Sequence, residues 1–246
     1  MPPRVLREGR YEVRFATDAV ELDRALALRY QVFNVELGEG LESSVESARD
    51  VDEFDPVCHH LLVIEGDSGE IVGTYRMQTA GMARRNRGFY SAGLFDLSTL
   101  PDAIVGSAVE VGRACVAREH RNTRVLFMLW KGLALYVAHN HLRYLFGCCS
   151  LTSQDPELGW RVMRHLEEED RTHPELRVEP VAACRLPAAE PRDEEVSLPI
   201  LFRTYLRYGS KVLSPPAIDR EFKTIDYLVM LDVDGLSRRT HRMFFG

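Results

Sequence analysis

The chain has 246 residues, of which 45% are hydrophobic and 28% are charged, a balance that is typical of a globular protein with a sizeable core. Its formal net charge of −6 gives no general attraction to nucleic acid, and no apolar run approaches the ~20 residues that span a membrane. The N-terminal stretch MPPRVLREGRYEVRF lacks the long apolar segment of a secretory signal, so we expect a cytoplasmic protein.

Alternation and helical periodicity predict an α/β protein with a mixed sheet. We expect strands at 11–16, 59–65, 70–80, 107–116, 143–150, 177–184 and 224–233. We expect helices at about 17–37, 123–142, 155–169 and 197–209. The remaining long segments are expected to be an acidic loop at 38–57, a basic loop at 82–88 and a surface excursion at 185–197. We interpret residues 1–246 as a single domain, with a core at about 11–184 and a C-terminal part at about 198–246 that packs on it.

The cysteines indicate neither a disulfide framework nor a metal site. Their number, five, is odd, and no CxxC pair occurs. Cys115 and the pair Cys148–Cys149 lie in apolar stretches, where free cysteine behaves as a small hydrophobic residue. We therefore expect buried, unreactive thiols and no bound metal or cofactor.

The first expected helix carries one charged residue on an apolar face. Three- and four-residue spacings place Arg29 among Leu22, Leu26, Phe33 and Leu37. An arginine on this face must either extend to solvent or meet a carboxylate, because an unpaired buried charge is very costly.

Other charged residues also stand in apolar surroundings. Asp52 and Asp55 lie in the acidic loop, and Arg76 ends the apolar stretch IVGTYR. Glu110 and Arg113 interrupt an expected strand and are three residues apart, so a regular strand would place them on opposite faces. Charged residues in apolar surroundings at four separate positions along the sequence favour one shared polar site.

Together these residues resemble the motif series of a known enzyme family. The motifs are R-Y-x-V-F at Arg29 to Phe33, D-x-x-D at Asp52 and Asp55, G-T-x-R ending at Arg76, and E-x-x-R at Glu110 and Arg113. This ordered series is similar to that of acyl-homoserine-lactone synthases, within the Gcn5-related N-acyltransferase superfamily. Other stretches resemble the bacterial ornithine-lipid N-acyltransferases, some of which are labelled hemolysin-like: FYSAGLFDLSTL (89–100), YLFGCCSL (144–151), TYLRYGSKV (204–212) and PAIDREFKTIDYLVML (216–231).

The resemblance covers roughly residues 11–240 and implies both a fold and an activity. The fold would be the superfamily's mixed β-sheet flanked by helices, with a C-terminal extension. The enzyme would transfer a long-chain acyl group, with or without a 3-hydroxyl, from acyl-[acyl carrier protein] to ornithine. The product would be a lyso-ornithine lipid, and its release could involve peripheral contact with the inner face of the membrane.

The turn between strand and helix indicates which thioester is used. In the superfamily this turn, typically R-x-x-G-x-G/A, binds the coenzyme A pyrophosphate through backbone N–H groups at a helix N-terminus. This chain has HRNTRVL at 120–126, where side chains replace the glycines that allow close approach. We therefore expect an acyl carrier protein, whose single phosphate Arg121 and Arg124 could contact. The candidate docking residues for this acidic partner are Arg84, Arg85, Arg87 and Arg118, although an ordinary solvated basic loop is the alternative.

Amide formation from a thioester needs a base for the amine and hydrogen-bond donors for the oxyanion. Glu110 is the carboxylate best placed as the base, and backbone N–H groups near Ala114, Cys115 and Val116 could supply the donors. Direct transfer needs no nucleophile, and Cys115 lacks a charged partner to activate it. The resemblance implies a substrate contact from Phe33 and a charge network that either shapes the site or braces the acidic loop. The residues of this network are Arg29, Asp52, Asp55, Arg76 and Arg113.

Two other functions remain open from the sequence. The first is an acyl-homoserine-lactone-type signal synthase that uses S-adenosylmethionine, which the C-terminal half favours less. The second is a non-catalytic, membrane-active protein, as the hemolysin label suggests, although the sequence indicates no amphipathic basic helix or spanning segment that would support it.

Overall fold

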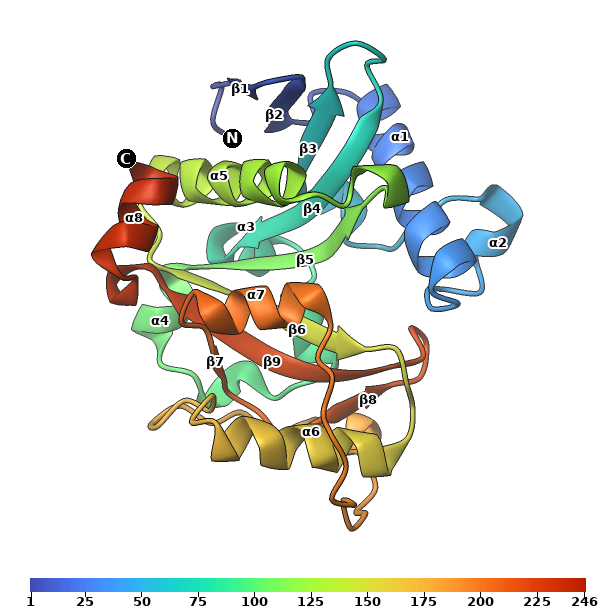
Figure 1. The fold of residues 1–246 in the computed structure, drawn as a ribbon, viewed down its shortest axis with the longest axis vertical. Helices are drawn as coiled ribbons and strands as arrows, with labels where there is room; N and C mark the ends of the chain where they lie inside the picture. The colour runs from blue at the N-terminus through green and yellow to red at the C-terminus, as the bar shows by residue number, and fades with distance from the viewer.

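The computed structural model describes residues 1–246 and has one nine-stranded sheet at its centre (Figure 1). The strand order is β1-β2-β3-β4-β5-β6-β9-β7, with β8 paired to β9. All the strand pairs are antiparallel except β5 with β6. The strands are β1 (Leu6–Glu8), β2 (Tyr11–Phe15), β3 (His59–Glu65), β4 (Ile71–Thr79), β5 (Ala108–Val116), β6 (Tyr144–Leu151), β7 (Lys211–Val212), β8 (Ala217–Asp219) and β9 (Thr224–Asp232).

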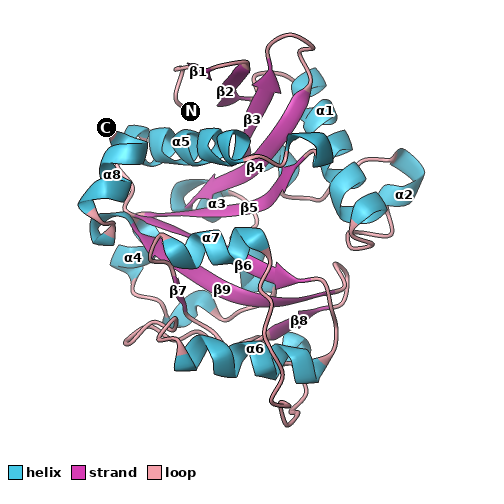
Figure 2. Ribbon diagram, viewed as in Figure 1, coloured by secondary structure: helices cyan, strands magenta, loops and turns pink.

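Helices cover both faces of this sheet (Figure 2). Helix α5 packs across β2, β3, β4 and β5, while α1 packs on the opposite face of β3 and β4. The helices are α1 (Ala19–Tyr30), α2 (Ser44–Ser47), α3 (Ala80–Arg85), α4 (Asp102–Gly106), α5 (Thr123–His139), α6 (Pro156–Glu168), α7 (Ile200–Arg207) and α8 (Arg238–Phe245). The predicted mixed α/β architecture is confirmed.

Local sequence explains where the main helices begin. Asp18, Asn122 and Asp155 each accept hydrogen bonds from backbone N–H groups in the first turn of α1, α5 and α6. Helix α1 continues without a break as a π-helical segment, Gln31–Glu36, which accounts for the longer helix expected from the sequence. No helix of the structure has the length and apolar character that crossing a bilayer requires.

Two expectations about local structure were wrong. The segment 177–184 is no strand: it makes a single bridge between Pro180 and Phe95 and ends in a 3₁₀ turn, Ala182–Cys184. Proline has no N–H to donate to a strand ladder, which explains why this apolar stretch does not join the sheet. The basic stretch expected as a loop at 82–88 begins inside α3.

The sheet opens between β5 and β6. The parallel pair extends only from Ala108–Tyr144 to Glu110–Phe146, and β6 then follows β9 while β5 stays with β4. Figure 1 shows the two strands diverging from this shared end. Gly147 follows immediately after the last pair, and a Cβ atom there would lie 2.1 Å from the backbone oxygen of Val111.

A β-bulge in β5 lies next to this opening. Gly112 pairs with Arg76 and Cys115 with Thr74, so two residues of β5 face one residue of β4. Arg113, the first of the two, has a φ of 50°, in the left-handed region that side chains rarely adopt. The expectation that Glu110 and Arg113 face opposite sides was therefore wrong, because the bulge turns both toward the same cavity.

Gly147→Ala should destabilise the protein by about 1–3 kcal/mol, the usual cost of overpacking. The added Cβ would clash with the backbone oxygen of Val111, which cannot move without shifting β5. Urea denaturation would measure the loss. Gly93→Ala is the matched control, because a Cβ there meets nothing within 4 Å. Equal stability of the two variants would show that the close approach of Gly147 to Val111 does not constrain the fold.

Candidate active site

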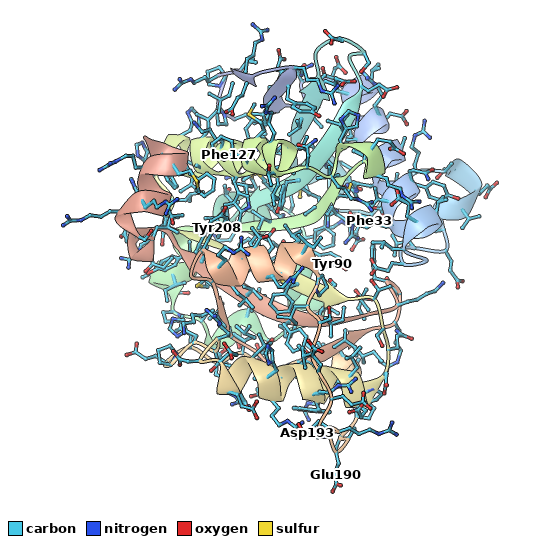
Figure 3. The ribbon with its side chains drawn as sticks, viewed as in Figure 1. Phe33, Tyr90, Phe127, Glu190, Asp193 and Tyr208 are labelled. Atoms are coloured by element: carbon cyan, nitrogen blue, oxygen red, sulfur yellow. The ribbon has the colours of Figure 1, made fainter.

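A cavity of about 300 Å³ lies where β5 and β6 part. Half of its 24 lining residues are hydrophobic, which gives it both apolar and polar walls. Figure 3 labels two of the wall residues, Phe33 and Tyr90, which come from distant parts of the chain. The charged residues of the wall are Glu39, Arg76, Glu110, Arg113, Asp219 and Asp226.

The charged residue on the apolar face of α1 meets carboxylates. Arg29 is fully buried, and its Nε donates to Asp50 over 2.6 Å. Its Nη1 donates to Asp55, also over 2.6 Å. Of the two alternatives for this arginine, extension to solvent was wrong, and pairing inside the protein is what the structure shows.

The same ion pairs continue to β4 and β5. Asp52 accepts from Arg76 at 2.5 Å and from Arg113 at 2.9 Å, while Arg76 also donates to Asp55 at 3.1 Å. The three arginines and three aspartates balance in charge. We call these six residues the arginine–aspartate cluster: Arg29, Asp50, Asp52, Asp55, Arg76 and Arg113.

The cluster is held in its charged form. Burial alone would raise the pKa of Asp55, but the guanidinium groups of Arg29 and Arg76 bring it down to about 2. The pKa of Asp52 is lowered against the same burial by Arg76 and Arg113. The cluster therefore joins α1, the acidic loop, β4 and β5 through charges that are compensated within the protein.

Arg113 also fixes two aromatic walls of the cavity. Its guanidinium carbon lies 4.0 Å from the ring centre of Phe222 and 4.7 Å from that of Tyr90. Both rings line the cavity. The bulge at Arg113 thus positions one side chain from an earlier part of the chain and one from a later part.

Glu110 lies in the cavity wall and binds the start of a neighbouring turn. Its carboxylate accepts from the backbone N–H groups of Tyr90 and Ser91, both at 2.8 Å, and from the Ser91 hydroxyl at 2.6 Å. Burial raises the pKa of Glu110, although these hydrogen bonds oppose the rise. A carboxylate with a raised pKa can exchange a proton closer to neutral pH than an exposed one.

Several residues expected at the substrate site lie outside the cavity wall. Phe33 and Ala114 line it, whereas Cys115 packs in a small apolar cluster where burial raises its pKa to about 12. Val116 packs against the main core. Arg121, in the turn before α5, donates to the backbone oxygen of Val116 and pairs with Glu36, and Arg124 is exposed.

The four candidate docking arginines are all exposed. Arg84 and Arg85 end α3, and Arg87 follows it and pairs with the exposed Glu53. Arg118 lies at the start of the 3₁₀ turn Arg118–His120.

Comparison with known proteins identifies the family. The profile of the acetyltransferase (GNAT) domain matches residues 28–131, which contain the whole arginine–aspartate cluster and Glu110. The L-ornithine N(alpha)-acyltransferase of Rhizobium meliloti (strain 1021) is 34% identical, over 95% of this chain and 83% of that protein. The protein of the same name from Agrobacterium fabrum (strain C58 / ATCC 33970) is 36% identical, over 95% and 84% respectively. The chain belongs to the L-ornithine N(alpha)-acyltransferase family.

Solved structures share the fold of this N-acyltransferase. The acyl-homoserine lactone synthase LasI superposes with a TM-score of 0.55 and 14% identity, over 96% of this chain and 95% of that one. FeeM, an N-acyl amino acid synthase from uncultured soil microbes, gives a TM-score of 0.55 and 12% identity, over 92% and 94%. At such identities the likeness concerns the fold alone, and it confirms the predicted Gcn5-related mixed sheet.

Sequence reasoning missed two polar residues that the acyltransferase places centrally. Asp50 pairs with Arg29, yet the acidic loop gave no periodicity that would separate it from neighbouring acids. Charge balance indicates that a third carboxylate is needed, because three arginines lie in apolar surroundings, but it does not select Asp50. Asp226 interrupts an apolar strand as Glu110 does, which is the signal that could have found it.

Arg29→Met should destabilise this acyltransferase by about 3–5 kcal/mol, because it removes the shortest ion pair of each of two buried aspartates, Asp50 and Asp55. Urea denaturation at pH 7 would measure the loss. Arg49→Met is the control, because Arg49 pairs with Asp23 at the surface and should matter little. A similar, small effect in both variants would contradict a buried cluster.

The same variant also has a predictable pH dependence. A carboxylate whose pKa is lowered on folding contributes stability above its unfolded pKa of about 4, and that stability is lost as pH falls through the folded value. For Asp55 the folded pKa is about 2. The difference in the free energy of unfolding between wild type and Arg29→Met should therefore become smaller as the pH is lowered from about 4 to about 2.

Proposed function

We propose that this N-acyltransferase moves a long-chain acyl group, with or without a 3-hydroxyl, from acyl-[acyl carrier protein] to the α-amine of ornithine. The product would be a lyso-ornithine lipid. The proposal is supported by the names of the relatives and, above all, by the two-sided character of the cavity. Leu201, Phe202 and Tyr205 of α7 give it an apolar wall, and the carboxylate of Glu110 lies in its polar wall.

Direct transfer accounts for the chemistry. The amine nitrogen attacks the thioester carbonyl, the C–S bond breaks, and the phosphopantetheine thiolate leaves and takes up a proton. Glu110 would accept the proton of the amine, directly or through water. Beyond Glu110 the strand β5 has no partner on its β6 side, so backbone N–H groups near Ala114 could donate to the oxyanion.

Glu110→Gln should lower kcat by ~10²–10⁴, the usual scale for general base catalysis. Thermal unfolding would confirm that the variant folds. Cys115→Ala is the control, since direct transfer makes no use of this thiol. Wild-type turnover in Glu110→Gln would remove Glu110 from the mechanism, and loss of activity in Cys115→Ala would favour an acyl-enzyme instead.

The start of α5 supports the carrier protein as donor. The side-chain oxygen of Asn122 accepts from the backbone N–H groups of Arg124 and Val125, each at 3.0 Å. These are the groups that a pyrophosphate would need at a helix N-terminus. The protein thus caps this terminus with its own side chain, where glycines would leave it open.

The chain should prefer acyl-[acyl carrier protein] over the matching acyl-coenzyme A in kcat/KM. Charge attraction to the carrier is screened over ~8–10 Å near physiological salt, so its rate should fall as salt rises, whereas the coenzyme A rate should change less. Equal use of both donors at low salt would contradict the donor preference.

The docking surface can be tested separately. Joint replacement of Arg84, Arg85 and Arg87 by Ala should raise KM for the carrier-bound donor and leave kcat unchanged. A matched control removes the same charge from α8, where Arg238, Arg239 and Arg242 are exposed. An equal rise in KM from both triple variants would indicate bulk charge and no defined docking site.

We also propose peripheral contact with the inner face of the membrane during product release. Exposed apolar side chains lie in the segment after α1 and within the acidic loop. They are Val35, Leu37, Val45 and Val51. Leu37 also lines the cavity, so this apolar surface lies beside the site where the lipid product would form.

A further inference from the structure

The cavity carries more negative charge than the protein compensates. Both of its arginines belong to the balanced arginine–aspartate cluster. The other four charged wall residues form no ion pair with any Lys, Arg or His side chain of the chain: Glu39, Glu110, Asp219 and Asp226. Buried charges without a partner are costly, so this surplus calls for an explanation.

Two of these four carboxylates are used by the fold. Glu110 accepts two backbone N–H groups and a hydroxyl. Asp219 accepts from the backbone N–H groups of Glu221 and Phe222 and from the hydroxyl of Tyr90. Such hydrogen bonds satisfy much of the demand of a buried carboxylate.

The other two carboxylates accept hydrogen bonds from hydroxyl groups only. Asp226, on β9, accepts from Thr224 and from Ser150, its partner across the β6–β9 pair. Glu39 accepts from Thr152. Burial raises the pKa of Asp226 to about 7, and the charges of Asp219 and Glu39 add to the rise. A cation bound beside these two carboxylates would offset the cost of burying their charges.

A second, independent feature lies near Glu110. Gln78 is 1% exposed and lines the cavity, yet neither its amide oxygen nor its amide nitrogen has a hydrogen-bond partner. It is the cross-strand partner of Glu110 in the β4–β5 pair. An unsatisfied buried amide is unfavourable, and a ligand with both donors and acceptors would satisfy it.

We propose that Asp226 and Glu39 bind the side-chain ammonium of the acceptor amino acid, while the amide of Gln78 hydrogen bonds to its α-amino and carboxylate end beside Glu110. This inference rests on the proposed acylation of ornithine and assigns the residues that select it. The amide oxygen of Gln78 suits the α-amine, and its N–H groups suit the carboxylate.

The spacing between Glu110 and Asp226 fits a short amino acid with an amine at the end of its side chain. The strand partners of Glu110 and Asp226 on β6 are Phe146 and Ser150, four residues or about 13 Å apart along the strand. Cys148 lies between them, and after burial the charges of Asp226 and Glu110 are the largest causes that raise its pKa. Side chains that reach inward from both ends leave room for a molecule a few carbon atoms long.

This arrangement would also choose between the two amines of ornithine. A protonated amine has no lone pair and cannot attack a thioester. Carboxylates that hold the side-chain ammonium keep it charged, whereas the α-amine is left beside Glu110, where it can lose its proton. The site would therefore direct acylation to the α-amine.

The test compares ornithine with norvaline, which has the same carbon chain without the terminal amine. Wild type should prefer ornithine by about 100-fold in kcat/KM, and Asp226→Asn should reduce that preference by about 10- to 100-fold, through loss of a charge-assisted hydrogen bond. Norvaline turnover should change by less than about twofold. Its inhibition constant against ornithine gives the same comparison if its turnover is slow.

Controls separate a binding role from a structural one. Asp232→Asn changes a carboxylate on the same strand that pairs with Arg143 at the surface, and it should leave both acceptors unaffected. Glu39→Gln should act in the same direction as Asp226→Asn, and it tests the subsite if the latter fails to fold. Gln78→Leu should raise KM for both acceptors while the thermal midpoint rises, because an unsatisfied buried amide is removed.

The outcomes distinguish this inference from the proposed function. If wild type does not acylate ornithine, the proposed function fails. If it acylates ornithine and norvaline equally well, ornithine remains the substrate but the ammonium subsite is overturned. If Asp226→Asn lowers both rates equally, the subsite is also overturned, and Asp226 would act in the acid–base chemistry or in the fold.

Discussion

The arginine–aspartate cluster is the interaction on which the rest of the structure depends. Arg29 of α1, Arg76 of β4 and Arg113 of β5 can be buried together only because three aspartates of one loop compensate them. The cluster thereby ties the acidic loop against the sheet, next to the point where β5 and β6 part. The guanidinium group of Arg113 in turn contacts the rings of Tyr90 and Phe222, which line the cavity. The cavity is thus shaped by charges that are themselves satisfied and have little left to offer a substrate.

In the proposed mechanism, the carboxylates outside the cluster carry out the substrate chemistry. Glu110 stands at the last residue where β5 and β6 pair, and Asp226 stands on the far side of the opening. The cavity of about 300 Å³ lies between them. The cluster is balanced in charge, whereas the other carboxylates of the cavity wall are not, and this surplus of negative charge suits the cationic amine substrate that we propose.

Much of this could be predicted from sequence, and the failures have physical causes. Period-two and period-3.6 patterns located the main strands and helices, because burial of one face controls them. The segment at 177–184 looked like a strand by composition, but Pro180 and the tertiary setting excluded it. The bulge at Arg113 cannot be read from alternation, since one extra residue reverses every later side chain. Asp50 was missed because only the folded structure chooses among several acids in one loop. Asp226 was missed although charges within the strands at 70–80 and 107–116 were recognised as signals.

The account rests on the claim that the enzyme joins an acyl group to the α-amine of ornithine. The most direct measurement is the structure of the product formed by the purified protein from acyl-[acyl carrier protein] and ornithine. Fragmentation mass spectrometry of that product distinguishes the two amines. The account predicts a single amide on the α-amine, with the side-chain amine free. No acylated ornithine, or acylation at the side-chain amine, would contradict it.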